Sequence, residues 1–172
     1  MRPAQRERRR TMTTALNVFE DLTGSIGREL AAGPWLRVDQ DRIDRFGAAT
    51  DDLQWIHTDP MRAAAGPYGG TVAHGYLTLS LLPVLTAAAV DFRGVRARVN
   101  YGLDRVRFPA PLPAGSRIRD RVSLAAVEDT GAGRRRLVLD HVVDVEDGRV
   151  PVCVATTITL FVASEAEGTR AA

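Results

Sequence analysis

The second half of the chain alternates apolar and polar residues with a period of two. Four runs show this alternation, over residues 95–108, 116–127, 134–145 and 150–162. A period of two is typical of strands that turn one face toward a core. The segments between the runs are rich in glycine, proline and aspartate, which favour tight turns. The pattern therefore predicts four long antiparallel strands.

A different pattern precedes these strands. Residues 75–90 are apolar on almost every side of a helical projection, which predicts a helix buried on all its faces. Pro83 lacks a backbone donor, so we expect a kink or a local opening in that helix. The run is shorter than the roughly 20 apolar residues that cross a bilayer, so we expect no membrane association.

The N-terminal part carries weaker signals. We expect a short helix and a loop over residues 12–33, followed by a first strand over 35–38. A helix over 42–49 follows, capped by Asp39 or Asp41.

A second short helix is predicted directly after the segment that carries the candidate chemistry. Asp59 supplies a capping carboxylate, Pro60 suits the first helical position, and Gly66-Pro67 ends the helix.

These elements define a fold class. A helix followed by consecutive strands, which tight turns connect, excludes a doubly wound parallel sheet. We predict an α+β fold in which an antiparallel sheet wraps around the long central helix. Such a sheet leaves an open edge and a half-covered helix, so we expect a homodimer that forms by edge-to-edge strand pairing.

Composition indicates one domain. A chain of 172 residues with 45% hydrophobic content can bury one substantial core. We expect a basic, flexible N-terminal extension over residues 1–14, a single domain over 15–164, and a flexible tail over 165–172. The extension has five arginines but no interleaved aromatic residues, so we expect no nucleic-acid partner.

The compartment is predicted from two further features. The lone cysteine, Cys153, falls in an alternating apolar run, which favours a buried, inert thiol and a reducing cytoplasm. The stretch that follows the arginines is too short and too polar for the apolar segment of an export signal.

Asp52 and His57 form the strongest candidate for chemistry. A carboxylate and a neutral imidazole can hold a water between them and pass its proton. Their spacing of five residues does not place them on one helix face, so a loop must bring them together. Gly75 opens the apolar helix, so a glycine turn and a buried helix start lie in the same segment as this pair. These features predict an enzyme that activates water beside a carbonyl.

The candidate residues also have structural interpretations. His57 alone is typical of a satisfied loop or core histidine. His74 caps the helix, lines the pocket or binds a phosphate, and Ser80 bonds back to a carbonyl or faces the substrate. Trp55 walls an acyl pocket or packs in the core. We predict no metal site, because zinc requires three or four firm ligands and Asp59 already serves as a cap.

The order of these residues resembles that of the MaoC-like dehydratases, the (R)-specific enoyl-thioester hydratases of the hotdog fold. The matching positions are Asp52 to His57, Asp59-Pro60, Ala73-His74-Gly75 and Ser80. Residues 99–102 and 106–111 are most similar to the NodN-like branch. The resemblance extends from about Trp35 to Ala163.

The chain departs from the family at one loop. The family commonly shows Gly-Asp-x-Asn-Pro-x-His, whereas here Asp51 replaces the glycine and Gln54-Trp55 replace Asn-Pro. We expect Asp51 to face water.

The resemblance implies a function and a set of roles. It implies reversible hydration of trans-2-enoyl thioesters to (R)-3-hydroxyacyl thioesters without a cofactor. It assigns Asp52 and His57 as catalytic and Gly75, His74, Ser80 and Trp55 as substrate-binding. The substrate is an acyl-CoA or acyl-carrier-protein thioester, and the subunit pairs with itself or with a related chain. The alternatives are a hotdog thioesterase and a non-catalytic subunit that binds acyl thioesters.

Overall fold

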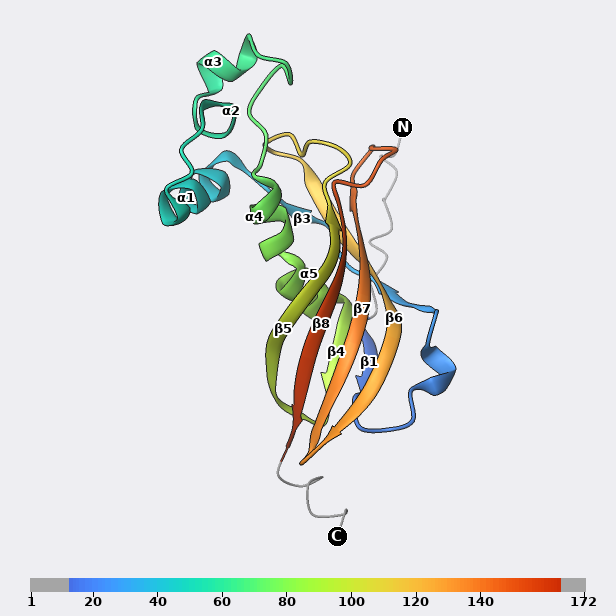
Figure 1. Ribbon diagram of the computed structural model, residues 1–172. Coiled ribbons are helices and arrows are strands. Elements are labelled where there is room, and N and C mark those ends of the chain that lie inside the picture. Colours follow the sequence, from blue (N-terminus) through green and yellow to red (C-terminus); the bar gives the residue numbers. More distant parts are fainter. Residues whose placement is uncertain (1–12, 165–172) are drawn as a thin grey trace, which may run out of the picture.

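The computed structural model describes residues 13–164, in which a twisted six-stranded sheet wraps around a helix (Figure 1). The residues 1–12 of the expected extension and the expected tail 165–172 lie outside the described residues. The six-stranded sheet has the order β2-β6-β7-β8-β5, and β3 also pairs with β6. Its strands are β2 (Glu29–Ala32), β3 (Leu36–Arg37), β5 (Val95–Arg107), β6 (Arg117–Gly131), β7 (Arg134–Val145) and β8 (Cys153–Ala163).

The four long strands lie where the period of two predicted them. Each pairs antiparallel with its long neighbours, and within the part of the chain that the structure describes β5 pairs with β8 alone. Along β6 and β7 buried residues alternate with partly exposed ones, because one face of the sheet packs on the helix. The expected α+β fold with a wrapped antiparallel sheet is therefore confirmed.

The central helix consists of two segments, α4 (Gly75–Ser80) and α5 (Leu82–Ala89). They join at Leu81, and Pro83 occupies the first turn of α5, where its missing N–H is harmless. The expected local opening is present at this junction.

The expectation of burial on every side of this helix is wrong for the single chain. Leu77, Leu81, Leu82 and Leu85 are buried against the sheet, whereas Tyr76 and Val84 on the opposite face are largely exposed. The sheet curls around one side of the helix, so an apolar stripe stays in contact with solvent.

The segment before the first predicted strand also differs from expectation. Residues 14–17 form strand β1 (Thr14–Asn17), which pairs parallel with β4 (Val90–Arg93). A single 3₁₀ turn, η1 (Thr23–Ser25), follows in place of the expected short helix. The strand partner of β1 lies some 76 residues away, and no local pattern reports such a pairing.

Three short helices gather at one end of the molecule, beyond the sheet and next to the start of α4 (Figure 1). They are α1 (Gln40–Thr50), α2 (Trp55–Thr58) and α3 (Pro60–Ala64). Asp39 caps α1 by accepting from the N–H of Arg42, and Asp59 caps α3 by accepting from the N–H of Arg62. Both capping predictions are confirmed, with Asp39 as the cap of α1.

The core follows the inner face of the sheet. Ile118, Leu124, Leu137 and Phe161 are fully buried there. Cys153 is buried too, and burial raises the pKa of its thiol to about 11, with a further contribution from the charge of Asp120. Among the helices within residues 13–164, none is long and apolar enough to span a membrane.

Candidate active site

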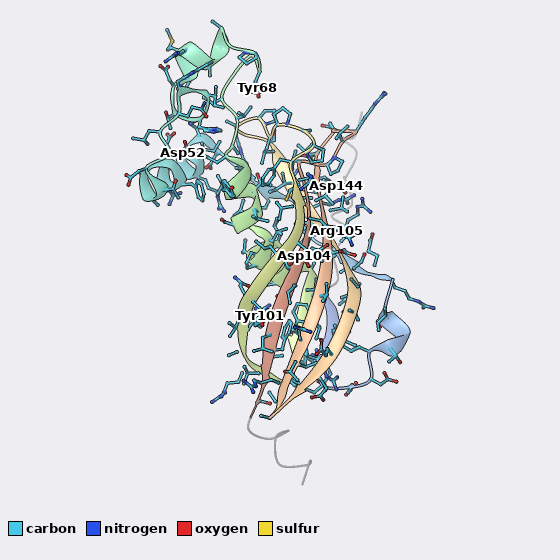
Figure 2. All side chains as sticks on the ribbon, in the orientation of Figure 1. Asp52, Tyr68, Tyr101, Asp104, Arg105 and Asp144 are labelled. Atoms are coloured by element: carbon cyan, nitrogen blue, oxygen red, sulfur yellow. The ribbon has the colours of Figure 1, made fainter. Side chains whose placement is uncertain are left out.

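Asp52 lies in the short connection between α1 and α2, at the end of the molecule where the three helices gather (Figure 2). His57 follows within α2. α1 ends at Asp51, whose backbone adopts the left-handed conformation with φ of 58°. Glycine adopts this conformation at least cost, and aspartate is among the few other residues that tolerate it. Asp51 therefore makes a left-handed turn at the end of α1, and its side chain is exposed as expected.

His57 is held in one tautomer. Its Nδ1 lies 2.6 Å from the carbonyl oxygen of Val72. A carbonyl only accepts hydrogen bonds, so Nδ1 carries the hydrogen and Nε2 of the neutral ring keeps its lone pair. Burial lowers the pKa of His57 below 6.5 and outweighs the hydrogen bond to Val72, which raises it. The side chain is thus a neutral base with a free Nε2.

His74 packs directly on His57. The two rings stack with centroids 3.8 Å apart and planes inclined by 29°. His74 Nε2 donates to the backbone oxygen of Asp52 at 2.9 Å and lies 3.9 Å from the carboxylate Oδ2. The side chain makes no capping hydrogen bond at the start of α4, although His74 occupies the N-cap position. Its structural effect is to fix the backbone of the Asp52 loop.

The Asp52 carboxylate completes the cluster. Its side chain is 50% exposed, and it offers an oxygen within 4.8 Å of ring nitrogens from both His57 and His74. Two groups separated by 4 to 5 Å or so can share a bridging water, each at normal hydrogen-bond distance. The loop therefore brings Asp52 and His57 together.

The same cluster is poorly arranged for a metal ion. A metal must lie close to the plane of each imidazole that binds it, at roughly 2.0–2.1 Å from the nitrogen. The planes of two rings whose centroids are 3.8 Å apart and which are inclined by only 29° do not meet that close to the nitrogens. The Asp59 carboxylate caps α3. The stacked pair suits a water molecule better than a shared ion.

Three residues that support the site were not found by sequence reasoning. Val72 accepts from His57, and the Gln40 side chain donates to the backbone oxygen of His57 at 2.7 Å. Gly47 packs under the loop, where a Cβ atom would lie 3.0 Å from the backbone oxygen of Asp52. An isolated glycine inside a predicted helix was the available signal for Gly47. The other two act through backbone contacts with residues distant in sequence.

Gly75 begins α4 beside the two histidines. As the first helical residue it has an N–H without a helical acceptor. The ring of Phe108 lies over its Cα, so a Cβ atom at this position would be 2.8 Å from the ring. Glycine is therefore required for close packing at the helix start.

Ser80 and Trp55 lie apart from the histidine pair. Ser80 donates to the backbone oxygen of Tyr76 at 2.7 Å, the back-bonding considered from its position in the helix. It also lines a cavity of about 680 Å³ between the central helix and the sheet. The Trp55 ring packs under the Arg62 guanidinium at 4.5 Å and against Gly66, so it braces α2 and α3.

Sequence comparison identifies relatives of the chain. The MaoC-like domain family matches residues 21–145. The 3-hydroxyacyl-thioester dehydratase Z of Mycobacterium tuberculosis is 46% identical over 143 residues, which cover 83% of this chain and 95% of that protein. Nodulation protein N of Rhizobium leguminosarum bv. viciae is 42% identical over 143 residues, covering 82% and 89% of the two chains.

Solved structures agree in fold. The monoamine oxidase regulatory protein from Archaeoglobus fulgius superposes with a TM-score of 0.65 at 23% identity, over 81% of this chain and 91% of that one. An (R)-hydratase from A. caviae involved in PHA biosynthesis gives a TM-score of 0.64 at 19% identity, over 76% and 93%. The sheet wrapped around α4 and α5 is thus the hotdog fold. The chain belongs to the MaoC-like dehydratase family, includes nodulation protein N among its relatives, and is an enzyme of the hydro-lyase class.

Proposed function

We propose that this chain catalyses the reversible hydration of trans-2-enoyl thioesters to (R)-3-hydroxyacyl thioesters. The observation that carries the proposal is the convergence of an Asp52 carboxylate oxygen and a ring nitrogen of His57 within 4.8 Å of each other, with the hydrogen of His57 held on Nδ1. The similarity to a protein described as a 3-hydroxyacyl-thioester dehydratase supports it.

In the hydration direction, a water bridges His57 Nε2 and the Asp52 carboxylate. One proton of the water passes to this pair, and the water oxygen forms a bond to the β-carbon of the enoyl group. The electron pair of the double bond moves toward the thioester, whose oxygen gains negative charge. The α-carbon then takes a proton from the same pair, which returns both side chains to their starting state. Atoms and charge balance without a cofactor.

Gly75 is the proposed partner of the thioester oxygen. The N–H of a first helical residue is a donor without a helical acceptor. Such a preorganised donor stabilises negative charge that develops in the transition state.

The proposal is tested with crotonyl-CoA and longer trans-2-enoyl-CoA substrates, by following the loss of the enoyl absorbance. We expect Asp52→Asn and His57→Gln to lower kcat by about 10²- to 10⁴-fold, because each removes half of the proton-transfer pair. Asp51→Asn is the matched control, since Asp51 is exposed and asparagine also tolerates its left-handed backbone. Its activity should equal that of the wild type.

Two outcomes would contradict the proposal. Turnover that survives both substitutions would remove the pair from the mechanism. Release of free CoA thiol without formation of a 3-hydroxyacyl product would assign thioester hydrolysis instead.

We also propose that the chain forms a homodimer through β5. Among the strands of residues 13–164, this strand of 13 residues pairs on one side only, with β8, and its Val99, Tyr101 and Leu103 side chains are exposed. A long edge strand with unpaired N–H and C=O groups is a template for pairing with another chain. The exposed stripe of Tyr76 and Val84 on the central helix adds apolar surface for a partner to cover.

A further inference from the structure

A second cluster of polar side chains is buried between the sheet and α5. His141 on β7 donates from Nδ1 to the Asp120 carboxylate on β6 at 2.9 Å. The Thr86 hydroxyl on α5 donates to the same carboxylate oxygen at 3.0 Å. His141 Nε2 lies 2.9 Å from the Thr157 hydroxyl on β8. Asp120 and His141 are 0% and 1% exposed, so four elements meet at one buried acid–imidazole–hydroxyl chain.

This series of hydrogen bonds ends at a cavity. His141, Thr86 and Thr157 all line the 680 Å³ hollow that Ser80 borders, and Thr157 is only partly buried. The volume lies within the range of roughly 300–1,000 Å³ that small-molecule sites occupy. The hydroxyl of Thr157 is therefore the point at which the buried cluster reaches space that a ligand can fill.

The Thr157 hydroxyl keeps one hydrogen-bonding position for a ligand. When the His141 ring is neutral, Nε2 accepts from the hydroxyl, whose oxygen still has lone pairs to offer. When the ring is protonated, the hydroxyl accepts from Nε2 and has its own hydrogen to donate. A ligand hydroxyl matches both cases, because it is a donor and an acceptor.

Burying a polar cluster this deeply costs free energy of folding, and core packing by itself does not require one. Buried carboxylates and imidazoles lose their hydration, and well-packed apolar residues often replace such groups without loss of stability. Within residues 13–164, the Oδ1 atom of Asp120 has no hydrogen-bond partner at all. An arrangement that only filled the core would satisfy its own polar atoms.

The cavity lies along the helix that begins at the active site. Gly75 and Thr86 are eleven residues apart in the sequence, which corresponds to roughly 16 Å along a helix. The lining includes Ser80 and Pro83 on the central helix and extends to Thr86 and His141. In the proposed reaction, an acyl chain whose thioester is held at Gly75 would have to pass along these residues to reach Thr157. Apolar lining residues such as Leu79, Leu103 and Ile158 suit the methylene part of such a chain.

We propose that the cavity selects acyl chains that carry a hydroxyl on their distal part, through a hydrogen bond to Thr157, with His141 and Asp120 as positioning residues. The placement of the thioester end rests on the proposed function. The hydroxyl recognition rests on the buried cluster and the cavity, which are independent of the Asp52–His57 pair.

Equilibrium binding of saturated acyl-CoA tests this proposal, because these ligands have no double bond to hydrate. Calorimetry compares ω-hydroxyacyl-CoA with unsubstituted acyl-CoA of the same length, for chains of about 8 to 14 carbons. At the length that reaches Thr157, we expect the hydroxylated ligand to bind about fivefold more tightly, which is the effect of one net hydrogen bond. The ratio of the two dissociation constants, unsubstituted to hydroxylated, should fall to about one in Thr157→Val and stay at about five in Thr157→Ser.

Thr159→Val is the matched control. Thr159 lies two residues away on β8 and lines the same cavity, yet no hydrogen bond joins it to His141. Its substitution should leave the ratio unchanged. His141→Gln should lower the ratio while unsubstituted acyl-CoA still binds, because Thr157 loses its orienting partner.

The outcomes separate this proposal from the proposed reaction. A ratio near one at every chain length in the wild type would overturn the hydroxyl recognition, as would equal loss of the ratio in Thr157→Val and Thr159→Val. A ratio that depends on Thr157 in an enzyme without enoyl-CoA turnover would support the recognition and overturn the reaction alone.

Discussion

The chemistry at the site depends on which ring nitrogen of His57 carries the hydrogen. The Val72 carbonyl fixes that hydrogen on Nδ1, and the stacked ring of His74 holds the imidazole plane. His74 in turn donates to the backbone of Asp52. One histidine therefore orients both members of the proposed proton-transfer pair without being required to exchange a proton itself.

The pH dependence of activity follows from the lowered pKa of His57. Desolvation is the main cause of the lowering, and the neighbouring His74 adds to it. Because the reaction requires neutral His57, kcat/KM should stay constant as the pH falls through 6.5 and decline only below the lowered pKa. A pH profile of kcat/KM measures this, and an acid limb centred above 6.5 would contradict it.

The same shift has a defined sign for stability. The pKa of His57 is lower in the folded chain than in the unfolded chain, where it is about 6.5, so protonation favours unfolding. The contribution of neutral His57 is fully present above 6.5 and is lost as the pH falls from there through the folded pKa. Urea denaturation across this window should show a smaller loss of unfolding free energy for His57→Gln than for the wild type. Equal losses in both proteins would refute this.

Cys153 should be an inert thiol in the native protein. With its pKa at about 11, only about one thiol in 10³ is ionised at pH 8, and the side chain is buried. The thiol reagent DTNB should therefore react at least about 100-fold more slowly with the native protein than with the urea-unfolded chain. Rapid reaction of the native protein would show that β8 opens readily.

At the level of elements, the start of α4 is where packing and chemistry meet. Gly75 lies under the Phe108 ring, which comes from the segment just after β5, and Tyr76 meets the same ring edge-on. The Phe108 ring thus contacts the start of the helix that offers the proposed oxyanion donor. A change in this contact moves the donor relative to Asp52 and His57.

Gly75→Ala should impair both stability and activity. Its Cβ atom would lie 2.8 Å from Phe108, so the ring or the helix start must shift. We expect a loss of roughly 1–3 kcal/mol in unfolding free energy, together with a lower kcat. Denaturation and turnover measure the two effects. Gly24→Ala is the control, because nothing lies within 4 Å of its added Cβ.

A second substitution distinguishes crowding from other causes. Phe108→Leu in the Gly75→Ala background should recover part of the stability, because a smaller side chain leaves room for the methyl group. Additive losses in the double variant would show that the ring is not the source of the strain.

At the level of the whole molecule, the edge of β5 and the exposed face of the central helix are neighbouring surfaces that one partner could cover. Figure 1 shows β5 at the border of the sheet, next to α4 and α5. Tyr101 lies on this strand (Figure 2). A partner that pairs with β5 would also shield the cavity that Tyr101 and Leu103 help to line.

Charge on this edge should dissociate the proposed homodimer. Val99→Lys introduces a charge into apolar surface that the partner would bury, so we expect the dissociation constant to rise by at least about tenfold. Val150→Lys is the matched control, since Val99 and Val150 are both 48% exposed and Val150 lies outside β5. Sedimentation velocity over a dilution series measures the effect, and equal behaviour of the two variants would exclude this edge.

Much of the fold was predictable because its signals are local. The period of two in β6 and β7 reports a sheet with one face in the core, and the caps at Asp39 and Asp59 are settled within three residues. The break near Pro83 follows from a missing donor. The expected helix near the N-terminus was wrong because β1 takes its conformation from β4, a partner distant in sequence.

The candidate site divides in the same way. Asp52, His57 and Gly75 were found because residue types at short spacing, together with a family resemblance, single them out. The dependence of His57 on Val72, and of Asp52 on His74, was not, because these contacts cross 15 and 22 residues of chain. They also involve backbone oxygens, which every residue has and no sequence motif marks.

The amino-acid sequence by itself determined the long strands, the central helix, their order and a candidate pair of side chains for proton transfer. Hydrophobic periodicity and capping act over a few residues and need no knowledge of the rest of the chain. Only the tertiary structure decided which atoms of that pair are free to react and that Asp120, His141 and Thr157 meet beside the cavity. Those three residues lie on three different strands, and the register between strands is set by the whole core at once.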